Sequence, residues 1–281
     1  MSTKPIALTI AGSDSGGGAG IQADIKSMEA NGVFAASAVT AITAQNSEAV
    51  TMSFNLPRQL IAAQIDAVAS DFDVTAAKTG MLSSSGIIET VADRVEANDL
   101  QPLVVDPVMV SKSGFKLLED DAVDTLRRRL IPMATVVTPN AHEAAILAGQ
   151  PIETVDDARA AAKAIFELGP EAVVVKGGHL DDDATVVDVF FDGTQLEVFP
   201  AARIDTRNTH GTGCTYASAI AAHLAHGRPL IEAIRRAKQY VTEAIRHALP
   251  YGSGHGPTNH FFHLDPNQVA EVHAEHAAGA S

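Results

Sequence analysis

The chain has 281 residues and a formal net charge of −14, because 34 acidic side chains outnumber 20 basic ones. This balance argues against nucleic acid or an anionic membrane as a partner, because those surfaces attract basic proteins. The 46% share of hydrophobic residues indicates a globular protein with a full core. The single cysteine, Cys214, excludes an internal disulfide and a cysteine-cluster zinc site, and it favours a reducing compartment.

Short apolar runs that predict buried strands alternate with longer segments of helical periodicity. The predicted strands cover residues 6–10, 37–43, 74–78, 103–106, 135–138, 172–176, 186–191 and 195–199. The predicted helices include residues 61–72, 87–95, 158–168, 213–224 and 230–248. Continuous apolar strands that alternate with helices are typical of a mostly parallel sheet covered on both faces.

The domain organisation follows from the absence of a linker-like segment or internal repeat in the sequence. We predict one domain over residues 1–264 and an extension at residues 265–281 that is either a terminal helix or a frayed end. Asp192-Gly193, between the last two predicted strands, is a type I′ hairpin signal and predicts an antiparallel edge. No segment has the pattern of a signal peptide or the apolar length of a membrane span, which predicts a cytoplasmic protein.

A glycine-rich segment, AGSDSGGGAG, follows the first predicted strand at residues 11–20 and precedes a helix. Its glycines let the backbone approach a ligand closely, and ligands of open α/β sheets bind outside the carboxyl ends of strands. The segment lacks the Gly-Lys-Ser/Thr of a P-loop, and a flexible turn is the alternative interpretation. Asp24, one turn into the helix, either points back toward the same site or faces water.

A second motif, NTHGTGCT, occupies residues 208–215 and opens an Ala-rich helix. The free N–H groups and the positive dipole end of a helix start attract anions, and glycines there leave room for a phosphate. Cys214 falls in the first turn, where we expect the pKa of its thiol to be lowered. The alternative is an ordinary helix entry with a small buried cysteine.

Polar side chains follow three of the predicted strands, namely Asp106, Asn140 and Lys176. Asn140 and Glu143 meet on one helix face, where they either hold the water shell of Mg²⁺ or form a capping box. Lys176 provides a point charge suited to a phosphate. A shared functional rim explains three polar strand ends more economically than three unrelated surface turns.

The order of these segments resembles the hydroxymethylpyrimidine/phosphomethylpyrimidine kinases of thiamine biosynthesis, a branch of the ribokinase superfamily. The resemblance runs from Ile6 to about Phe262 through AGSDSGGGAGIQADIK, TAITAQNS, KTGML, VVDPVMVSKSG, TPNAHEA, VVVKGGH, NTHGTGCTYASAIAA and GHGPTNHF. It implies a ribokinase-like three-layer α/β/α sandwich with a mostly parallel central sheet.

The resemblance also implies roles for the matching positions. The implied substrate pocket contains Gly12, Asp24, Gln45, Met81 and Val108. The Gln45 amide offers a donor and an acceptor to an aminopyrimidine edge, and Met81 offers a pliable apolar wall.

The implied nucleotide side contains a metal site, phosphate contacts, an anion hole and a base. Asp106 and Glu143 correspond to the magnesium site, and the nucleotide contacts are Asn140, Glu143, Lys176 and Lys238. The anion hole is formed by Gly211, Thr212 and Gly213, and Cys214 takes the place of the aspartate base found in much of the superfamily.

The implied activity is the phosphorylation, with ATP and Mg²⁺, of 4-amino-5-hydroxymethyl-2-methylpyrimidine and then of its monophosphate. Relatives are often dimers, which implies a homodimer. Two alternatives stay open, a pyridoxal kinase of the same superfamily and a non-catalytic binder of a vitamin precursor. The intact set of Asp106, Asn140, Glu143, Lys176 and Cys214 argues against the binder, because binding alone needs neither a metal site nor a base.

Overall fold

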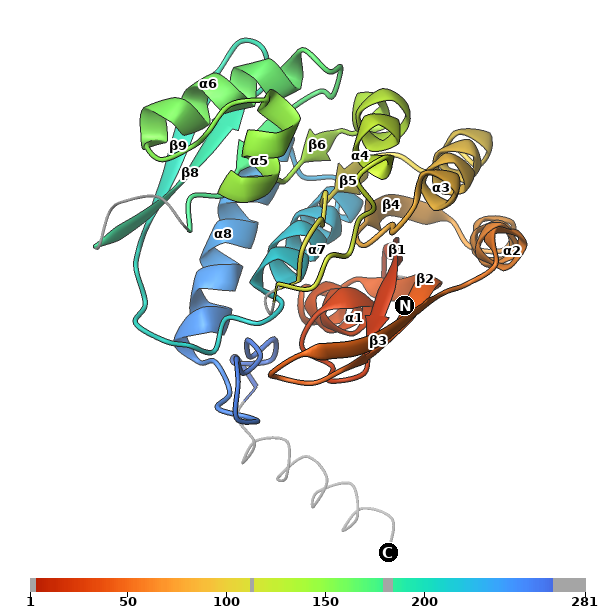
Figure 1. The fold of residues 1–281 in the computed structure, drawn as a ribbon, viewed down its shortest axis with the longest axis horizontal. Helices are drawn as coiled ribbons and strands as arrows, with labels where there is room; N and C mark the ends of the chain where they lie inside the picture. Colours follow the sequence, from red (N-terminus) through yellow and green to blue (C-terminus); the bar gives the residue numbers. More distant parts are fainter. Residues whose placement is uncertain (1–3, 112–113, 179–183, 265–281) are drawn as a thin grey trace, which may run out of the picture.

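The computed structural model describes residues 4–111, 114–178 and 184–264 of the chain. Within these residues nine strands form one sheet, in the order β3-β2-β1-β4-β5-β6-β7-β8-β9 (Figure 1). The strands are β1 (Ile6–Asp14), β2 (Phe34–Gln45), β3 (Val50–Asn55), β4 (Val74–Thr79), β5 (Leu103–Val105), β6 (Val136–Val137), β7 (Val173–Val175), β8 (Thr185–Phe191) and β9 (Leu196–Ala202). The predicted extension at residues 265–281 lies outside the described residues.

The centre of the sheet is parallel, and both of its edges are antiparallel. Strands β2, β1, β4, β5, β6 and β7 run parallel, whereas β3, β8 and β9 pair antiparallel with their neighbours. The predicted hairpin of β8 and β9 is confirmed, but the predicted type I′ turn is wrong. Such a turn needs positive φ at both central residues, and Gly193 has a φ of 88° while Asp192 is not among the residues with positive φ.

Strand β3 was not expected from the sequence. Its pattern is mostly exposed, and Val50 is its one buried residue. It therefore lacks the alternation of apolar and polar residues that marks a half-buried strand.

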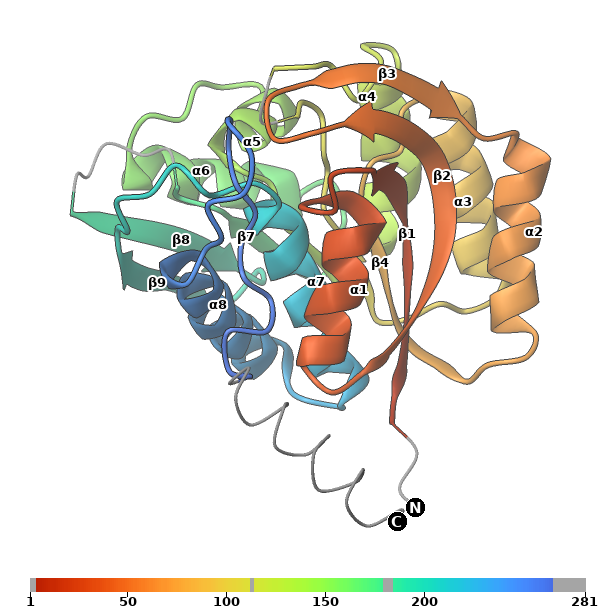
Figure 2. The ribbon, with the colours of Figure 1, turned by 90° about the horizontal axis from the view of Figure 1, so that it is seen from below.

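Helices cover both faces of the sheet. They are α1 (Gly20–Ala30), α2 (Arg58–Ala69), α3 (Ser85–Ala97), α4 (Ala122–Thr125), α5 (Ala141–Ala148), α6 (Val155–Phe166), α7 (Thr212–Ala225) and α8 (Leu230–Arg246). Helix α4 continues into η1 (Leu126–Leu130), a π-helix, and η2 (Ile131–Met133), a 3₁₀-helix. Figure 2 shows α1, α7 and α8 together on one side of the sheet, and α2 and α3 on the other.

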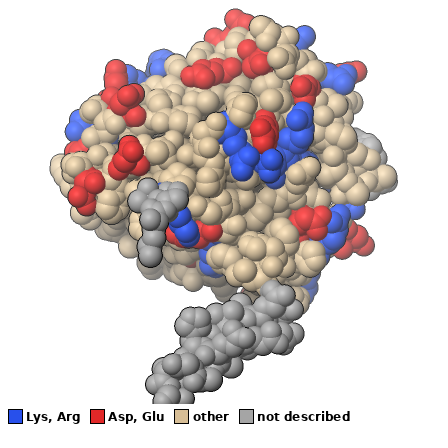
Figure 3. Space-filling model, turned by 180° about the vertical axis from the view of Figure 1, so that it is seen from behind, with Lys and Arg blue, Asp and Glu red and all other residues tan. Residues whose placement is uncertain are grey.

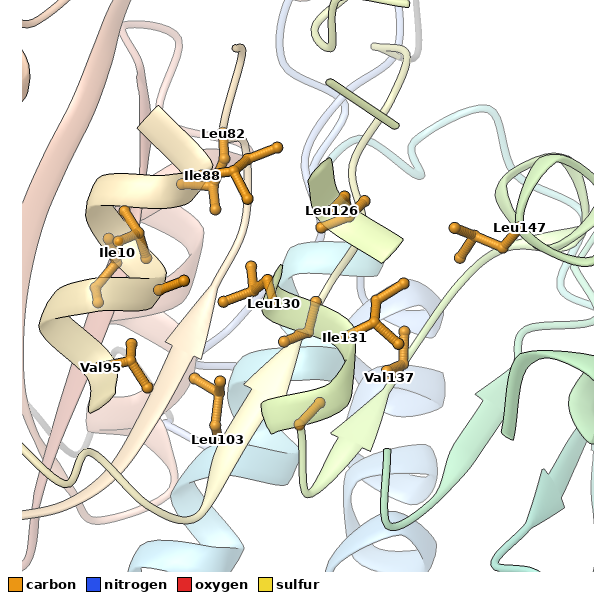
Figure 4. Close-up of a cluster of buried hydrophobic side chains, with 14 of the residues drawn as sticks. Ile10, Leu82, Ile88, Val95, Leu103, Leu126, Leu130, Ile131, Val137 and Leu147 are labelled. Carbon is orange, nitrogen blue, oxygen red and sulfur yellow. The ribbon is translucent and has the colours of Figure 1, made fainter. Parts of the chain in front are cut away.

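Two apolar cores lie between these layers, one on each face of the sheet. Both faces are apolar because successive residues of a strand point to opposite sides of the sheet. Leu8 and Ile10 of β1 belong to the core that holds α2, α3, α5 and α6, whereas Ala7 belongs to the core that holds α1, α7 and α8. Figure 4 shows part of the first core, where Ile10 and Leu103 of the sheet lie near Ile88 and Leu130. The predicted three-layer α/β/α arrangement is confirmed.

The parallel strands bring their carboxyl ends to one edge of the sheet. Asp106, Thr138 and Lys176 directly follow β5, β6 and β7, which are neighbours in the sheet. The predicted rim of polar strand ends is therefore a continuous feature of the fold. Among the described residues, the structure contains no helix of the length and apolarity required to cross a membrane.

Candidate active site

A cavity of about 900 Å³ opens at the carboxyl edge of the parallel strands. Every predicted site residue except Asp24 lines it, although these residues come from segments far apart in the sequence. They are Gly12, Gln45, Met81, Asp106, Val108, Asn140, Glu143, Lys176, Gly211, Thr212, Gly213, Cys214 and Lys238.

The rim of the cavity is built around an ion pair. Lys176 Nζ lies 2.8 Å from Asp106 Oδ1, which also accepts a hydrogen bond of 3.3 Å from Thr138 Oγ1. Asn140 begins α5 as its N-cap, and its side chain and that of Glu143 form a capping box. The capping interpretation of this pair is thus confirmed, and the same two residues also face the cavity.

The charges on this rim do not balance, because two buried carboxylates face one ammonium group. Burial, aided by the charge of Asp106, raises the pKa of Glu143 to about 7 against the lowering effect of Lys176. Burial alone lowers the pKa of Lys176, but Asp106 and Glu143 outweigh it, so its pKa rises and it stays charged. The rim can therefore accept a further cation.

The start of α7 forms a wall of the cavity beside this rim. Gly211 is its N-cap with a φ of 79°, and an ideal Cβ there would overlap the carbonyl oxygen of Gly18. An ideal Cβ on Gly213 would lie 3.3 Å from Lys176 Nζ, so glycine keeps this space open. The first N–H groups of a helix lack partners within the helix and can bind an anion. Here the N–H of Thr212 donates to Thr209 O over a long 3.3 Å, a bond that an anion would replace.

Cys214 does not have the lowered pKa that its place in the helix suggested. Burial raises the pKa of its thiol to about 12, and the opposing effect of Lys78 is smaller. The sequence showed the helix start but not how much of the thiol's hydration the fold removes.

Residues of β1, β2 and β4 shape the other end of the cavity. The Met81 side chain packs against Gly12, where an ideal Cβ would lie 2.8 Å from Met81 Sδ. Gln45 ends β2, and Val108 follows β5, so both reach the same space. This end has an apolar wall with a single amide, which suits a small ring.

Comparison with known proteins identifies the family. The phosphomethylpyrimidine kinase family matches residues 14–259 of the chain. The chain belongs to this family. A hydroxymethylpyrimidine/phosphomethylpyrimidine kinase from Rhizobium meliloti is 53% identical over 91% of this chain and 97% of that protein. The protein of the same name from Streptomyces coelicolor is 50% identical over 92% of this chain and 95% of that protein.

Solved structures of related kinases have the same fold. The ADP complex of Bacillus subtilis pyridoxal kinase has a TM-score of 0.86 and 42% identity, over 92% of this chain and 98% of that chain. A phosphomethylpyrimidine kinase from Clostridium difficile has a TM-score of 0.77 and 43% identity, over 86% of this chain and 100% of that chain. The predicted ribokinase-like fold is confirmed, and the chain is an ATP-using kinase of this family.

Asp24 of this kinase does not reach the cavity. Its carboxylate is fully buried, pairs with Lys78 Nζ at 2.9 Å, and accepts hydrogen bonds from Thr9 (2.6 Å) and Ser218 (2.7 Å). Lys78 lines the cavity in its place. Although burial lowers the pKa of Lys78, the charge of Asp24 outweighs it and the pKa rises above its ordinary value.

Four residues of the cavity were not predicted from the sequence, namely Lys78, Asp14, Asp188 and His210. A lysine inside an apolar strand was a usable signal for Lys78, because lysine is rarely buried without a partner. Asp188 lies 2.7 Å from Lys238 Nζ and joins β8 to α8, a contact that no local pattern reveals. Asp14 and His210 line the cavity and lie 2.8 Å apart despite 196 positions of separation.

Proposed function

We propose that this kinase phosphorylates 4-amino-5-hydroxymethyl-2-methylpyrimidine with ATP, and then its monophosphate, as part of thiamine biosynthesis. The observation that carries the proposal is one cavity that joins a wall for a small ring to a rim for phosphate. The wall for the ring is formed by Gly12, Gln45 and Met81. The rim for phosphate is formed by Lys176 and the start of α7. The activity named for the relatives from Rhizobium meliloti and Streptomyces coelicolor supports the same substrate.

Catalysis of phosphoryl transfer rests mainly on positioning and on the neutralisation of charge. In the proposed reaction, the substrate hydroxyl oxygen forms a bond to the γ-phosphorus while the bond to the β–γ bridging oxygen breaks, releasing ADP. Lys176 and the N–H groups of Gly211, Thr212 and Gly213 stabilise the transferring phosphoryl group. Lys238, held by Asp188 at 2.7 Å, provides a positive charge on the nucleotide side of the cavity.

The hydroxyl proton passes to the thiolate of Cys214. A loose transition state lets this proton leave late, so the thiolate can act although it is a minor species. The neighbouring Lys78 favours the thiolate, whereas burial and the carboxylates of Asp24 and Asp106 disfavour it.

The rim fits a magnesium ion. When both carboxyl groups are ionised, Asp106 and Glu143 leave one negative charge that Lys176 does not neutralise, and Asn140 adds an amide beside them. This suits Mg²⁺, which keeps several waters and takes substrate phosphates as ligands. When bound, the ion supplies charge neutralisation for the β- and γ-phosphates.

An assay of ADP release tests the function directly. Purified protein is given the hydroxymethylpyrimidine, its monophosphate or pyridoxal, with and without excess EDTA. We expect turnover of both pyrimidines, its loss with EDTA and its return with added Mg²⁺. Pyrimidine binding without ADP release would support the non-catalytic binder instead.

Pyridoxal phosphorylation is the second candidate. Two structural relatives with TM-scores of 0.86 and 0.87, from Bacillus subtilis and Staphylococcus aureus, are pyridoxal kinases. The same ADP-release assay decides between the substrates. A kcat/KM for pyridoxal above that for the hydroxymethylpyrimidine would make pyridoxal the preferred substrate.

We also propose a homodimer, one domain over residues 1–264 and a cytoplasmic location. Met52, Phe54 and Ile42 expose 69%, 65% and 51% of their surface, and Phe54 pairs with Ile42 in the β2–β3 ladder. This apolar face and the outer edge of β3 support pairing with a second chain.

Strands from residues 6 to 202 share one sheet, which supports a single domain. A free thiol in the cavity supports a reducing compartment.

A further inference from the structure

The glycine-rich loop folds around one of its own side chains. The N–H groups of Gly18 (3.1 Å) and Ala19 (2.8 Å) donate to Asp14 Oδ2, and that of Gly16 donates to Oδ1 at 2.8 Å. The N–H between them, of Gly17, donates to the backbone oxygen of Asp14 at 2.9 Å. Successive N–H groups of this kind form a concave site for an anion. Here the Asp14 carboxylate fills that site, so a phosphate could bind to the loop only by displacing it.

The same carboxylate also reaches the segment that precedes α7. Asp14 Oδ2 lies 2.8 Å from His210 Nε2, and the two side chains are only 3% and 11% exposed. Although burial raises the pKa of Asp14, the hydrogen bonds from His210 and from the loop outweigh it and hold the pKa below its ordinary value. Asp14 is therefore ionised at neutral pH, and it accepts a charge-assisted hydrogen bond from the Nε2–H of His210.

His210 adjoins the anion hole at the start of α7. Gly211 follows it directly, and an ideal Cβ on Gly211 would overlap the carbonyl oxygen of Gly18. An ideal Cβ on Gly18 would in turn overlap the His210 ring. The backbone at Gly18 therefore packs against both the ring and the first residue of the anion hole. Because close packing transmits displacement, a shift of the loop moves the anion hole with it.

We propose that Asp14 and His210 are positioning residues, and that the glycine-rich loop orients the anion hole instead of binding a phosphate itself. The Asp14 carboxylate sets the shape of the loop, and its bond to His210 fixes the start of α7 against that loop. The N–H groups of Gly211, Thr212 and Gly213 are thereby held where the transferring phosphoryl group develops its charge. The inference rests on the proposed role of these N–H groups in the transfer.

Steady-state kinetics of two asparagine variants test this role. Asp14→Asn removes the charge from the loop, and the side chain of His210→Asn is too short to place an N–H where Nε2 lies. We expect each change to lower kcat roughly 10–100-fold, the effect of losing a hydrogen bond to a charged group. The KM values for ATP and the pyrimidine should change less than about threefold, because the lost contacts are those of the transition state. The double variant should be at most about twofold worse than the poorer single variant, since both break one contact.

Two matched variants separate positioning from general damage. His210→Gln places an amide N–H near the position of Nε2, and it should retain most of the wild-type kcat. His226→Asn changes a histidine that bonds to Asn31 O at the far end of α7, and it should leave kcat and both KM values unchanged. Thermal unfolding checks that each variant is folded at the temperature of the assay.

Amide hydrogen exchange measures the same coupling without turnover. The N–H groups of His210 and Thr212 form backbone hydrogen bonds at the start of α7. In Asp14→Asn they should exchange at least about tenfold faster than in wild type, because the segment has lost its anchor. Asp14 and His210 are 196 positions apart, so this change can pass only through the folded contact. His226→Asn should leave these exchange rates unchanged.

The results that overturn the inference are distinct from failure of the proposed function. An unchanged kcat in both asparagine variants, or unchanged exchange in Asp14→Asn, would show that backbone bonds alone position α7. A raised KM for ATP at unchanged kcat would make the loop a phosphate site. If neither variant folds, the nitrogen-15 spectrum of wild type decides, because a His210 Nε2–H that loses its hydrogen-bonded shift when ADP binds overturns the inference. If wild type phosphorylates neither pyrimidine, the proposed function fails, and hydrogen exchange still tests the coupling.

Discussion

Cys214 lies in the first turn of α7, close enough to Lys78, Asp24 and Asp106 for their charges to act on its thiol. A helix start and a lysine favour the thiolate, whereas burial and two carboxylates favour the thiol. Burial dominates and raises the pKa to about 12. At neutral pH the thiolate is therefore a small fraction, which restricts how the residue can serve as a base.

Replacing Cys214 with alanine should lower kcat by about 10²–10⁴-fold, the usual contribution of a general base. The KM for the pyrimidine should change little, because phosphate and ring contacts come from other residues. Steady-state kinetics measure both constants, and nucleotide binding by calorimetry checks that the cavity is intact. A kcat near that of wild type would remove Cys214 from this role.

The pH profile provides a second test of the same residue. Below a pKa of about 12, the thiolate fraction grows tenfold for each pH unit, so kcat/KM of wild type should rise with pH over about pH 7.5–9.5. Cys214→Asp should level off at a far lower pH than wild type, because the ordinary pKa of an aspartate lies roughly four to five units below that of a cysteine, even where the same burial raises both. A flat wild-type profile would contradict proton transfer to Cys214.

The Lys78–Asp24 pair is the most deeply buried ion pair in the described residues, with both side chains 0% exposed. Lys78→Met should lower the free energy of unfolding by about 3–5 kcal/mol, because it leaves the Asp24 carboxylate without its partner. Lys78→Met combined with Asp24→Asn should cost much less, since it removes both charges. Urea unfolding measures all three proteins.

A matched exposed pair provides the control for this prediction. Arg129 lies 2.7 Å from Asp93, and these side chains are 44% and 56% exposed. Arg129→Met should change the free energy of unfolding by less than about 1 kcal/mol. Equal losses for Lys78→Met and Arg129→Met would show that burial of the pair contributes nothing.

At the scale of elements, the start of α7 packs backbone to backbone on the glycine-rich loop. Gly211 and Gly227 both have positive φ, 79° and 73°, but an ideal Cβ overlaps Gly18 O at Gly211 and meets nothing within 4 Å at Gly227. Both alanine variants should lose about 1–2 kcal/mol of stability from backbone strain, and Gly211→Ala should lose more because of the overlap with Gly18 O. Gly211→Ala should also lower kcat/KM by about 10²-fold, because it displaces the anion hole.

The two glycine variants are compared by thermal unfolding and by kinetics. The expected pattern is a drop in stability for both and a loss of activity for Gly211→Ala alone. If Gly227→Ala lost as much activity as Gly211→Ala, strain at any turn would explain the result, and the contact with Gly18 would be irrelevant.

The parallel strands and the polar residues that follow them could be predicted from the sequence. Apolar runs such as residues 172–176 identify strands buried on both faces, and parallel strands bring Asp106 and Lys176 to the same edge. Strand β3 could not be predicted, because its exposed side chains depend on pairing with β2. The Asp14–His210 contact could not be predicted either, since it exists only after the sheet and α7 pack together.

At the scale of the whole molecule, the charge of −14 accompanies a site in which carboxylates match the lysines. Figure 3 shows Lys and Arg next to Asp and Glu on the face opposite to that of Figure 1. The cations that matter to the proposed reaction, Lys78, Lys176 and Lys238, line the cavity, and each is paired with an aspartate. Because these pairs carry no net positive charge, we expect ATP binding to need magnesium.

The proposed dimer makes a prediction about the β2–β3 face. Replacing Met52 and Phe54 together with glutamate should convert a dimer into a monomer, because it places two charges on the largest exposed apolar side chains of that face. Sedimentation equilibrium should give about twice the chain mass of 29.3 kDa for wild type and about one chain mass for the variant. Val198→Glu is the control, since Val198 is also exposed (38%) but lies on β9, at the opposite edge of the sheet, and it should remain dimeric. A monomeric wild type would contradict the dimer, and a dimeric double variant would place the contact elsewhere.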